Sequence, residues 1–184
     1  PIATKSYESM AKMRKVQPKM KQVQERFKND RQRLQIEMAN LYRREKINPA
    51  SGCLPLLLQI PVFFALYKVL SISINMRQAP FFGWIEDLSM PDPLTVLNGF
   101  GYFGYEVPAF LCIGVWPILM GLTMYIQQKL SPAPADQTQA KMMQFLPVIF
   151  TLMMASFASG LIIYWTWSNI LSILQQKYIM KKIG

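Results

Sequence analysis

The sequence predicts an all-α membrane protein, a helical bundle with four transmembrane helices preceded by a basic two-helix hairpin. Of the 184 residues, 52% are hydrophobic and only 16% are charged, too few charges to cover a soluble surface. Four long apolar stretches follow one another along the chain. The first 48 residues hold 13 Lys and Arg against 5 Asp and Glu, so most of the net charge of +10 lies in one arm.

The apolar stretches define the expected spans. A helix needs about 20 residues to cross a bilayer core of roughly 30 Å. Small residues and Gly160 indicate a tight turn between the last two stretches, because one helix through both would be too long for a single crossing. We therefore expect a basic arm at 1–48 and a transmembrane core at 49–184. The core should contain an outer loop at 75–107 and spans at about 53–74, 108–130, 142–158 and 160–180.

The arm is expected to fold as a helical hairpin. Apolar residues repeat every three or four positions from Met13 to Phe27, and again from Leu34 to Leu41 after a break in the pattern. Pro18 lies inside the first helix and should kink it. The residues leave two interpretations open, a surface that docks a partner and a basic surface beside anionic lipid headgroups.

Loop charge predicts the orientation, because Lys and Arg are retained on the cytoplasmic side of a membrane. The basic arm should therefore be cytoplasmic. The loop 75–107 then falls outside, where Arg77 is outnumbered by four acidic residues. The loop 131–141 and the C-terminus fall inside, and both carry or adjoin lysines. The three remaining segments thus agree with a cytoplasmic arm and a cytoplasmic C-terminus.

Polar side chains gather in the cytoplasmic half of the predicted spans, whereas the outer halves are almost purely apolar. Polar groups are costly in a bilayer core and tend to face a cavity or the bundle interior. The pattern predicts a hydrophilic recess open to the cytoplasm, with hydrogen bonding between helices as the alternative. The residues expected to line the recess are Gln59, Thr123, Gln127, Ser168 and Asn169. For Gln128, Gln144 and Gln175 we expect the alternative, hydrogen bonding between helices together with ordinary polarity near helix ends.

The sequence gives little support to catalysis. It contains no His, which removes the commonest general base and metal ligand. Cys53 and Cys112 lie in apolar runs, where a thiol usually behaves as a small hydrophobe. The segment Gly99–Gly104 matches G-x-G-x-x-G but lacks the strand, helix and acid of a dinucleotide site. We therefore expect no enzyme activity, metal, cofactor or small-molecule substrate.

Several short strings follow one another in a specific order. They are Ser9-Met-Ala-Lys-Met-Arg14, Asn48-Pro49 with Gly52-Cys-Leu-Pro55, Arg77-Gln-Ala-Pro80, Trp84-Ile-Glu-Asp-Leu-Ser89, Pro147-Val-Ile-Phe-Thr151, and Tyr164-Trp165 with Ser168-Asn169. Together they resemble the bacterial YidC membrane insertase family, also called the YidC/oxidase-assembly family, over nearly the whole chain. The loop 98–107 looks longer than in the best-known members.

The resemblance implies a core of five transmembrane helices with a cytoplasmic hairpin, in the bacterial inner membrane. Such a protein receives nascent membrane proteins from the ribosome, alone or beside the Sec translocon, and releases them into the phospholipid bilayer without nucleotide hydrolysis. Residues 1–48 would be the hairpin and the four spans core helices two to five. The first core helix, with its groove Arg, is expected just before Pro1.

The resemblance also assigns roles to individual residues. Gln127 and Trp165 look like positions that line the substrate groove. Ile60, Phe63 and Met153 look like the greasy face, or slide, along which a substrate segment leaves toward lipid. The residues leave two other functions open, a small transporter or channel and an RNA-binding arm on a membrane anchor.

Overall fold

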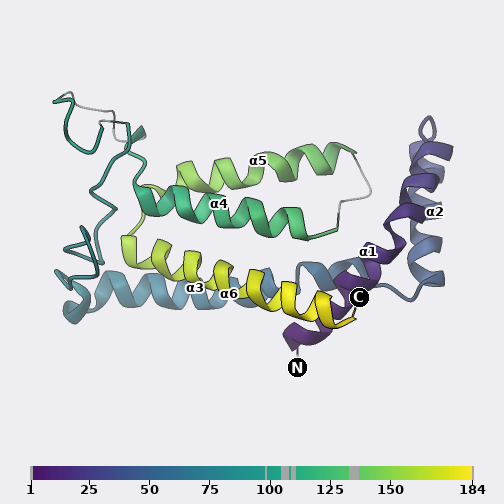
Figure 1. Cartoon of the computed structure of the whole chain (residues 1–184), viewed down its shortest axis with the longest axis horizontal. Helices are drawn as coiled ribbons and strands as arrows, with labels where there is room; N and C mark the ends of the chain where they lie inside the picture. The colour runs from purple at the N-terminus through teal and green to yellow at the C-terminus, as the bar shows by residue number, and fades with distance from the viewer. Residues whose placement is uncertain (1, 98, 105–107, 109–110, 133–136, 184) are drawn as a thin grey trace.

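The computed structural model describes residues 2–97, 99–104, 108, 111–132 and 137–183. Over these residues the chain forms six α-helices, and the one strand-like pairing is an isolated bridge between Thr95 and Gly114. The predicted all-helical class is confirmed for this part of the chain. Four helices form an elongated bundle, with a helical hairpin at one end and an irregular loop at the other (Figure 1). We call these the hairpin end and the loop end.

The N-terminal arm forms α1 (Ile2–Arg26) and α2 (Arg31–Arg44). The Asp30 carboxylate caps α2 by accepting a 3.1 Å hydrogen bond from the backbone N–H of Arg33. Helix α1 continues through Pro18 and changes direction along its length, so that one part lies near α6 and the other pairs with α2 (Figure 1). The two apolar stripes meet in a small core made by Met13, Val16, Met20, Met38 and Ile47.

The bundle consists of α3 (Leu54–Ile72), α4 (Val115–Leu130), α5 (Gln137–Met154) and α6 (Ser159–Ile183). The short 3-10 helices η1 (Pro49–Gly52) and η2 (Ile74–Met76) flank α3. Helix α4 packs most extensively on α6 and also on α5. Among the described residues, the one helical stretch that is both long and apolar enough to cross a membrane is 49–72, and little of it is buried.

Helix α4 covers only the later part of the range 108–130 predicted for the second span. Helix α4 begins at Val115 rather than at residue 108, and residues 109–110 lie outside the described part of the chain. The backbone N–H of Val96 donates to the carbonyl of Ile113 at 3.1 Å, and Thr95 pairs with Gly114, whose backbone is extended directly before α4. The 16 residues of α4 make a helix about 24 Å long.

Helix α5 is displaced along the chain from the range predicted for the third span. Helix α5 covers 137–154 instead of 142–158, because the polar residues before 142 join the helix and the chain turns before Ser159. The predicted turn between the last two spans is present, since α6 begins at Ser159. Helices α3 and α6 differ from their predicted bounds by one to three residues at each end.

The loop after α3 fixes the loop end of the bundle. The backbone N–H groups of Ser159 and Gly160 donate to the carbonyls of Met90 and Leu88 at 2.7 and 3.0 Å. A Cβ atom on Gly160 would lie 3.0 Å from the Leu88 carbonyl oxygen, so a glycine permits this close approach. The loop thereby pairs N–H groups that a helix start would otherwise leave unsatisfied.

Candidate functional site

A cavity of about 270 Å³ lies between the helices toward the hairpin end, and we call it the polar cavity. Helices α1, α3, α4, α5 and α6 all contribute to its wall. None of the described residues that line it is acidic or basic, so it offers hydrogen bonds without formal charge. The amide and serine side chains at its wall include Gln59, Gln127, Gln128, Ser168, Asn169 and Ser172.

The structure brings the six predicted groove residues together. Five of them line the polar cavity, namely Gln59, Gln127, Trp165, Ser168 and Asn169. The sixth, Thr123, lies beside it, because the Asn169 Nδ2 group donates to the Thr123 hydroxyl at 3.2 Å. That hydroxyl in turn donates to the carbonyl of Met120 at 2.8 Å. This chain of hydrogen bonds joins α6 to α4 and holds the Asn169 amide in place, while the role of these residues toward a substrate stays a prediction.

Gln59 brings an unsatisfied polar group to the polar cavity. Its side-chain Nε2 atom is buried and has no hydrogen-bond partner among the described residues. A buried donor left unpaired costs about 1–3 kcal/mol. A water molecule or a polar group of a ligand in the cavity would therefore find a donor on α3 ready to bind it.

Trp165 marks the point at which the polar cavity ends. Its indole ring meets the ring of Phe63 edge-on, with centroids 5.2 Å apart, and lies 6.2 Å from the ring of Phe150. Trp165 also belongs to a buried apolar cluster on all four bundle helices. Its other buried members, toward the loop end, are Leu70, Met120, Met154, Leu161 and Ile162. Beyond Trp165 the bundle interior is therefore packed with apolar side chains.

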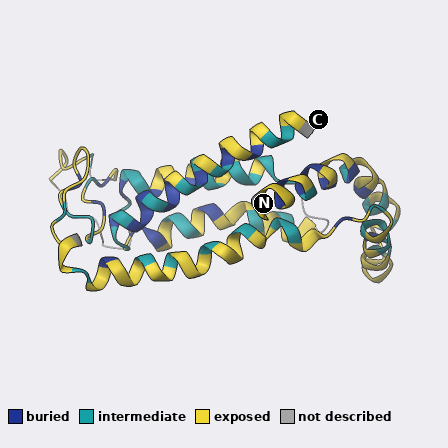
Figure 2. Cartoon of the chain, turned by 90° about the horizontal axis from the view of Figure 1, so that it is seen from below, coloured by how far each residue is buried: buried dark blue, intermediate teal, exposed yellow. Residues whose placement is uncertain are grey.

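The predicted slide residues lie in two kinds of environment. Ile60 on α3 and Met153 on α5 are 42% and 52% exposed. Phe63 is half-buried and packs on Trp165 and Phe157, so it forms part of the interior wall. Exposed residues run along the outer sides of the bundle helices (Figure 2). The proposed exit of a substrate along this surface stays a prediction.

Helix α1 also contributes to the polar cavity, although none of its residues was predicted to line the recess. Tyr7 and Met10 line the cavity, and the hydroxyl of Ser6 donates to the carbonyl of Ser51 at 2.7 Å. Tyr7 and Met10 extend the apolar stripe of α1 at spacings of three toward Met13. That extension of the periodic pattern was the available signal.

Gln176 is a further interior polar residue that the sequence predictions did not include. Its side chain is 1% exposed and its Nε2 group donates to the carbonyl of Leu130 at 3.3 Å, which links α6 to the end of α4. The neighbouring Gln175 is exposed, as expected for ordinary polarity near a helix end. Asn169, Ser172 and Gln176 follow the i, i+3, i+7 spacing of one helix face, a signal that could have identified Gln176.

Comparison with known proteins identifies the family. The model of the 60Kd inner membrane protein family matches residues 1–184. The membrane protein insertase YidC of Rhizobium meliloti (strain 1021) is 58% identical over 184 residues, which cover 100% of this chain and 31% of the relative. The membrane protein insertase YidC of Brucella suis biovar 1 (strain 1330) is 57% identical over 100% of this chain and 30% of its own length. That of Rickettsia canadensis (strain McKiel) is 56% identical over 98% of this chain and 32% of its own length.

The chain thus spans about a third of the length of these curated relatives. The match over the whole chain confirms the resemblance inferred from the ordered motifs. The chain belongs to the 60Kd inner membrane protein family.

Proposed function

We propose that this chain forms the core of a membrane protein insertase. A nascent hydrophobic segment would place its polar flank in the polar cavity while its apolar part moves into the bilayer. The observation that carries the proposal is an uncharged polar cavity that stops at the apolar cluster around Trp165. The name of the relatives, membrane protein insertase, agrees with this function.

The driving force would come from the substrate itself. Moving apolar surface from water into lipid is favourable by roughly 25 cal/mol per Å². The opposing term is the free energy needed to move the polar flank through hydrocarbon. Amide and hydroxyl groups in the polar cavity lower this free energy, because they replace water as hydrogen-bond partners of the flank. The chain therefore needs no nucleotide for this step.

The proposed membrane placement has helices α3 to α6 crossing the inner membrane with the hairpin end in the cytoplasm. Its support is the basic arm, which by the positive-inside rule stays on the cytoplasmic side. The ribosome and the Sec translocon are the proposed partners. The many exposed Lys and Arg side chains of α1 and α2 suit the polyanionic surface of a ribosome.

A transporter or channel is not favoured, because it would need polar groups along both halves of the bundle. The buried cluster from Trp165 to Leu70 offers apolar side chains in the loop-end half. An insertase that passes a segment into lipid needs polar groups only on the side where the segment enters. The polar side chains of the polar cavity at the hairpin end fit this requirement better.

Site-specific crosslinking tests the insertase proposal. A photo-crosslinker at Gln127, in the polar cavity, should capture a ribosome-bound nascent membrane protein. The matched control places the same probe at Leu122, which is on the same helix and 53% exposed. Capture at Leu122 equal to that at Gln127 would rule out the polar cavity as the site of reception.

A second experiment tests the hydrogen bond between Asn169 and Thr123. The variant Thr123→Val removes the hydroxyl that accepts from Asn169 at 3.2 Å, whereas Thr123→Ser keeps it. Loss of one such bond is worth about 1 kcal/mol, so insertion of a segment with a polar flank should slow about fivefold in the Val variant. Insertion of a purely apolar segment should change less. Equal slowing of both substrates would point to a general packing defect instead.

A further inference from the structure

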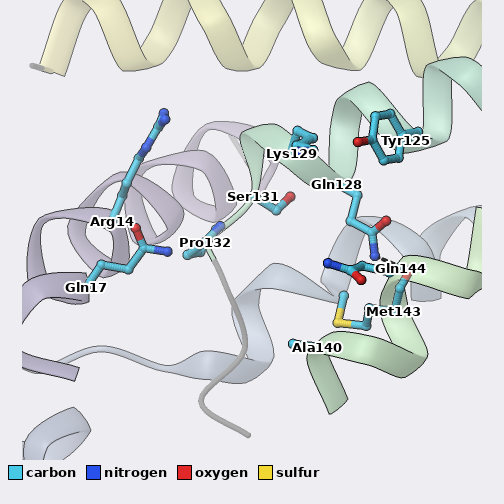
Figure 3. A pocket seen from close by; sticks show the side chains of 10 residues that line it. All are labelled: Arg14, Gln17, Tyr125, Gln128, Lys129, Ser131, Pro132, Ala140, Met143 and Gln144. Carbon is cyan, nitrogen blue, oxygen red and sulfur yellow. Dashed lines mark hydrogen bonds between the residues drawn. The ribbon is translucent and has the colours of Figure 1, made fainter. Parts of the chain in front are cut away.

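A second pocket, of about 500 Å³, lies at the hairpin end between α1, α4 and α5. Figure 3 shows Arg14 and Gln17 on one side of it and Gln128 and Gln144 on the other. It adjoins the polar cavity, since Gln128 lines both. The polar side chains that line this second pocket, which we call the basic pocket, are Arg14, Gln17, Gln128, Lys129, Ser131 and Gln144.

Among the described residues, the basic pocket holds two cations, Arg14 and Lys129, and no acidic side chain. The Arg14 guanidinium contacts the sulfur of Met180 at 3.5 Å, and the Lys129 ammonium lies 5.3 Å from the centre of the Tyr125 ring. Neither forms an ion pair within the described part of the chain, and no described residue that lines the pocket is acidic. The Gln128 amide already donates to the carbonyl of Met143, but Arg14, Lys129 and the amides of Gln17 and Gln144 remain at the wall of the pocket. Such a set of donors is suited to an anion with several oxygen acceptors.

The surface beside the basic pocket indicates what kind of molecule carries the anion. Helices α4 and α5 continue from the pocket toward the loop end with exposed apolar side chains. These include Leu122, Ile126, Phe145 and Ile149, which are between 39% and 63% exposed. A phospholipid fits both parts, because its phosphate needs donors and cations while its acyl chains need an apolar surface. An acidic protein segment would leave this apolar surface uncovered.

We propose that the basic pocket binds the phosphate of an anionic phospholipid from the cytoplasmic leaflet, with the acyl chains along α4 and α5. The proposal rests on the membrane placement given above and not on insertase activity. The bound lipid joins Arg14 on α1 to Lys129 on α4, so it holds the hairpin against the bundle. Anionic lipid thereby becomes a structural partner of the hairpin end.

Native mass spectrometry of the full chain in detergent tests this site. Phosphatidylglycerol should bind the wild type more tightly than phosphatidylcholine, and its affinity should fall about tenfold in the double variant Arg14→Gln, Lys129→Gln. The matched control is Lys15→Gln with Lys141→Gln, which removes the same charge at exposed positions of α1 and α5 outside the pocket. The control should bind phosphatidylglycerol like the wild type.

Further arms separate the possible outcomes. The charge-preserving double variant Arg14→Lys, Lys129→Arg should retain most of the binding, which distinguishes loss of charge from loss of fold. Equal weakening in the glutamine control would reduce the effect to diffuse charge and overturn the proposal. Inorganic phosphate that binds as tightly as the lipid would assign the pocket to a free anion. An acidic peptide that displaces the lipid at lower concentration would assign it to a protein partner.

Discussion

Asp92 connects the loop after α3 to the start of α4. Its carboxylate accepts hydrogen bonds from the Trp84 indole at 2.9 Å, from the backbone N–H of Leu94 at 3.0 Å and from the backbone N–H of Trp116 at 2.9 Å. A Cβ atom on Gly114 would lie 2.5 Å from the Asp92 side chain, so only a glycine leaves room for the carboxylate. A residue distant in sequence thus acts as the N-terminal cap of α4.

The variant Asp92→Ala should destabilise the protein by about 1–2 kcal/mol, because it removes a charged acceptor and leaves three partly buried donors without their partner. Thermal unfolding followed by circular dichroism in detergent measures the loss. Glu86→Ala is the matched control, since Glu86 is an exposed acid of the same loop. Equal destabilisation by both variants would mean that the loop charge, and not the cap, matters.

The turn at Asp87 holds the start of α6 through the carboxylate and the carbonyl of this residue. The hydroxyl and the backbone N–H of Ser89 donate to its carboxylate at 2.6 and 2.8 Å, and these bonds hold the pKa of Asp87 below its ordinary value. The Asp87 carbonyl accepts from the hydroxyl of Ser159 at 3.2 Å, so the same turn holds the start of α6. Protonation of Asp87 should therefore loosen the contact between loop and helix.

The expected pH dependence follows from the lowered pKa. The pKa of the Asp87 carboxyl is lower in the folded protein than in the unfolded chain, where it is about 4. The ionised carboxylate therefore stabilises the protein above about pH 4. This contribution is lost as the pH falls through the pKa of the folded state. The melting temperature should therefore drop on acidification below about pH 4, and by less in Asp87→Asn than in the wild type. An identical acid profile in the two proteins would contradict this role.

At the scale of elements, the sequence predicts a helix well when the apolar residues of that helix recur at helical spacing and are buried. The stripe from Met13 to Met20 was enough to place the hairpin core, because its partner Met38 follows on the next helix. The start of α4 could not be predicted in the same way. It depends on Thr95 and Asp92, residues whose pairing with the segment before α4 no local pattern reveals.

Gly121 allows a close approach between α4 and α5. A Cβ atom on Gly121 would lie 2.1 Å from the Thr151 hydroxyl oxygen, and that hydroxyl donates to the carbonyl of Pro147 at 2.8 Å. The variant Gly121→Ala should therefore destabilise the bundle by about 1–3 kcal/mol through overpacking. Thermal unfolding of the purified protein gives the size of the effect.

A double-mutant cycle identifies the cause. In a Thr151→Ala background the obstructing oxygen is absent, so Gly121→Ala should cost clearly less than in the wild type. Gly52→Ala is the control, since a Cβ there would meet its nearest neighbour, Met10, at an ordinary 3.8 Å. Additive effects at Gly121 and Thr151 would show that the two helices do not rely on this contact.

At the scale of the whole molecule, the polar and apolar halves of the bundle follow from the order of residues along each helix. The sequence places Gln59, Gln127 and Asn169 in the cytoplasmic halves of their predicted spans. In the structure all three line the polar cavity. The hydrogen bond between Asn169 and Thr123, and the contribution of Tyr7 of α1 to the cavity wall, depend on the packing of helices that are distant in sequence. The position of each residue along its predicted span thus predicted which residues line the cavity. The hydrogen bonds that fix their side chains depend on tertiary packing.

The proposed orientation predicts which positions a membrane-impermeant maleimide can reach in intact cells. With Cys53 and Cys112 replaced by Ser, a cysteine at Tyr102, which is 90% exposed in the outer loop, should be labelled from outside. A cysteine at Gln139, exposed at the hairpin end, should be labelled only after the membrane is permeabilised. The reverse pattern would invert the proposed topology. It would also place the polar cavity on the far side of the membrane from the ribosome, so the same result would remove the physical basis for reception of nascent chains.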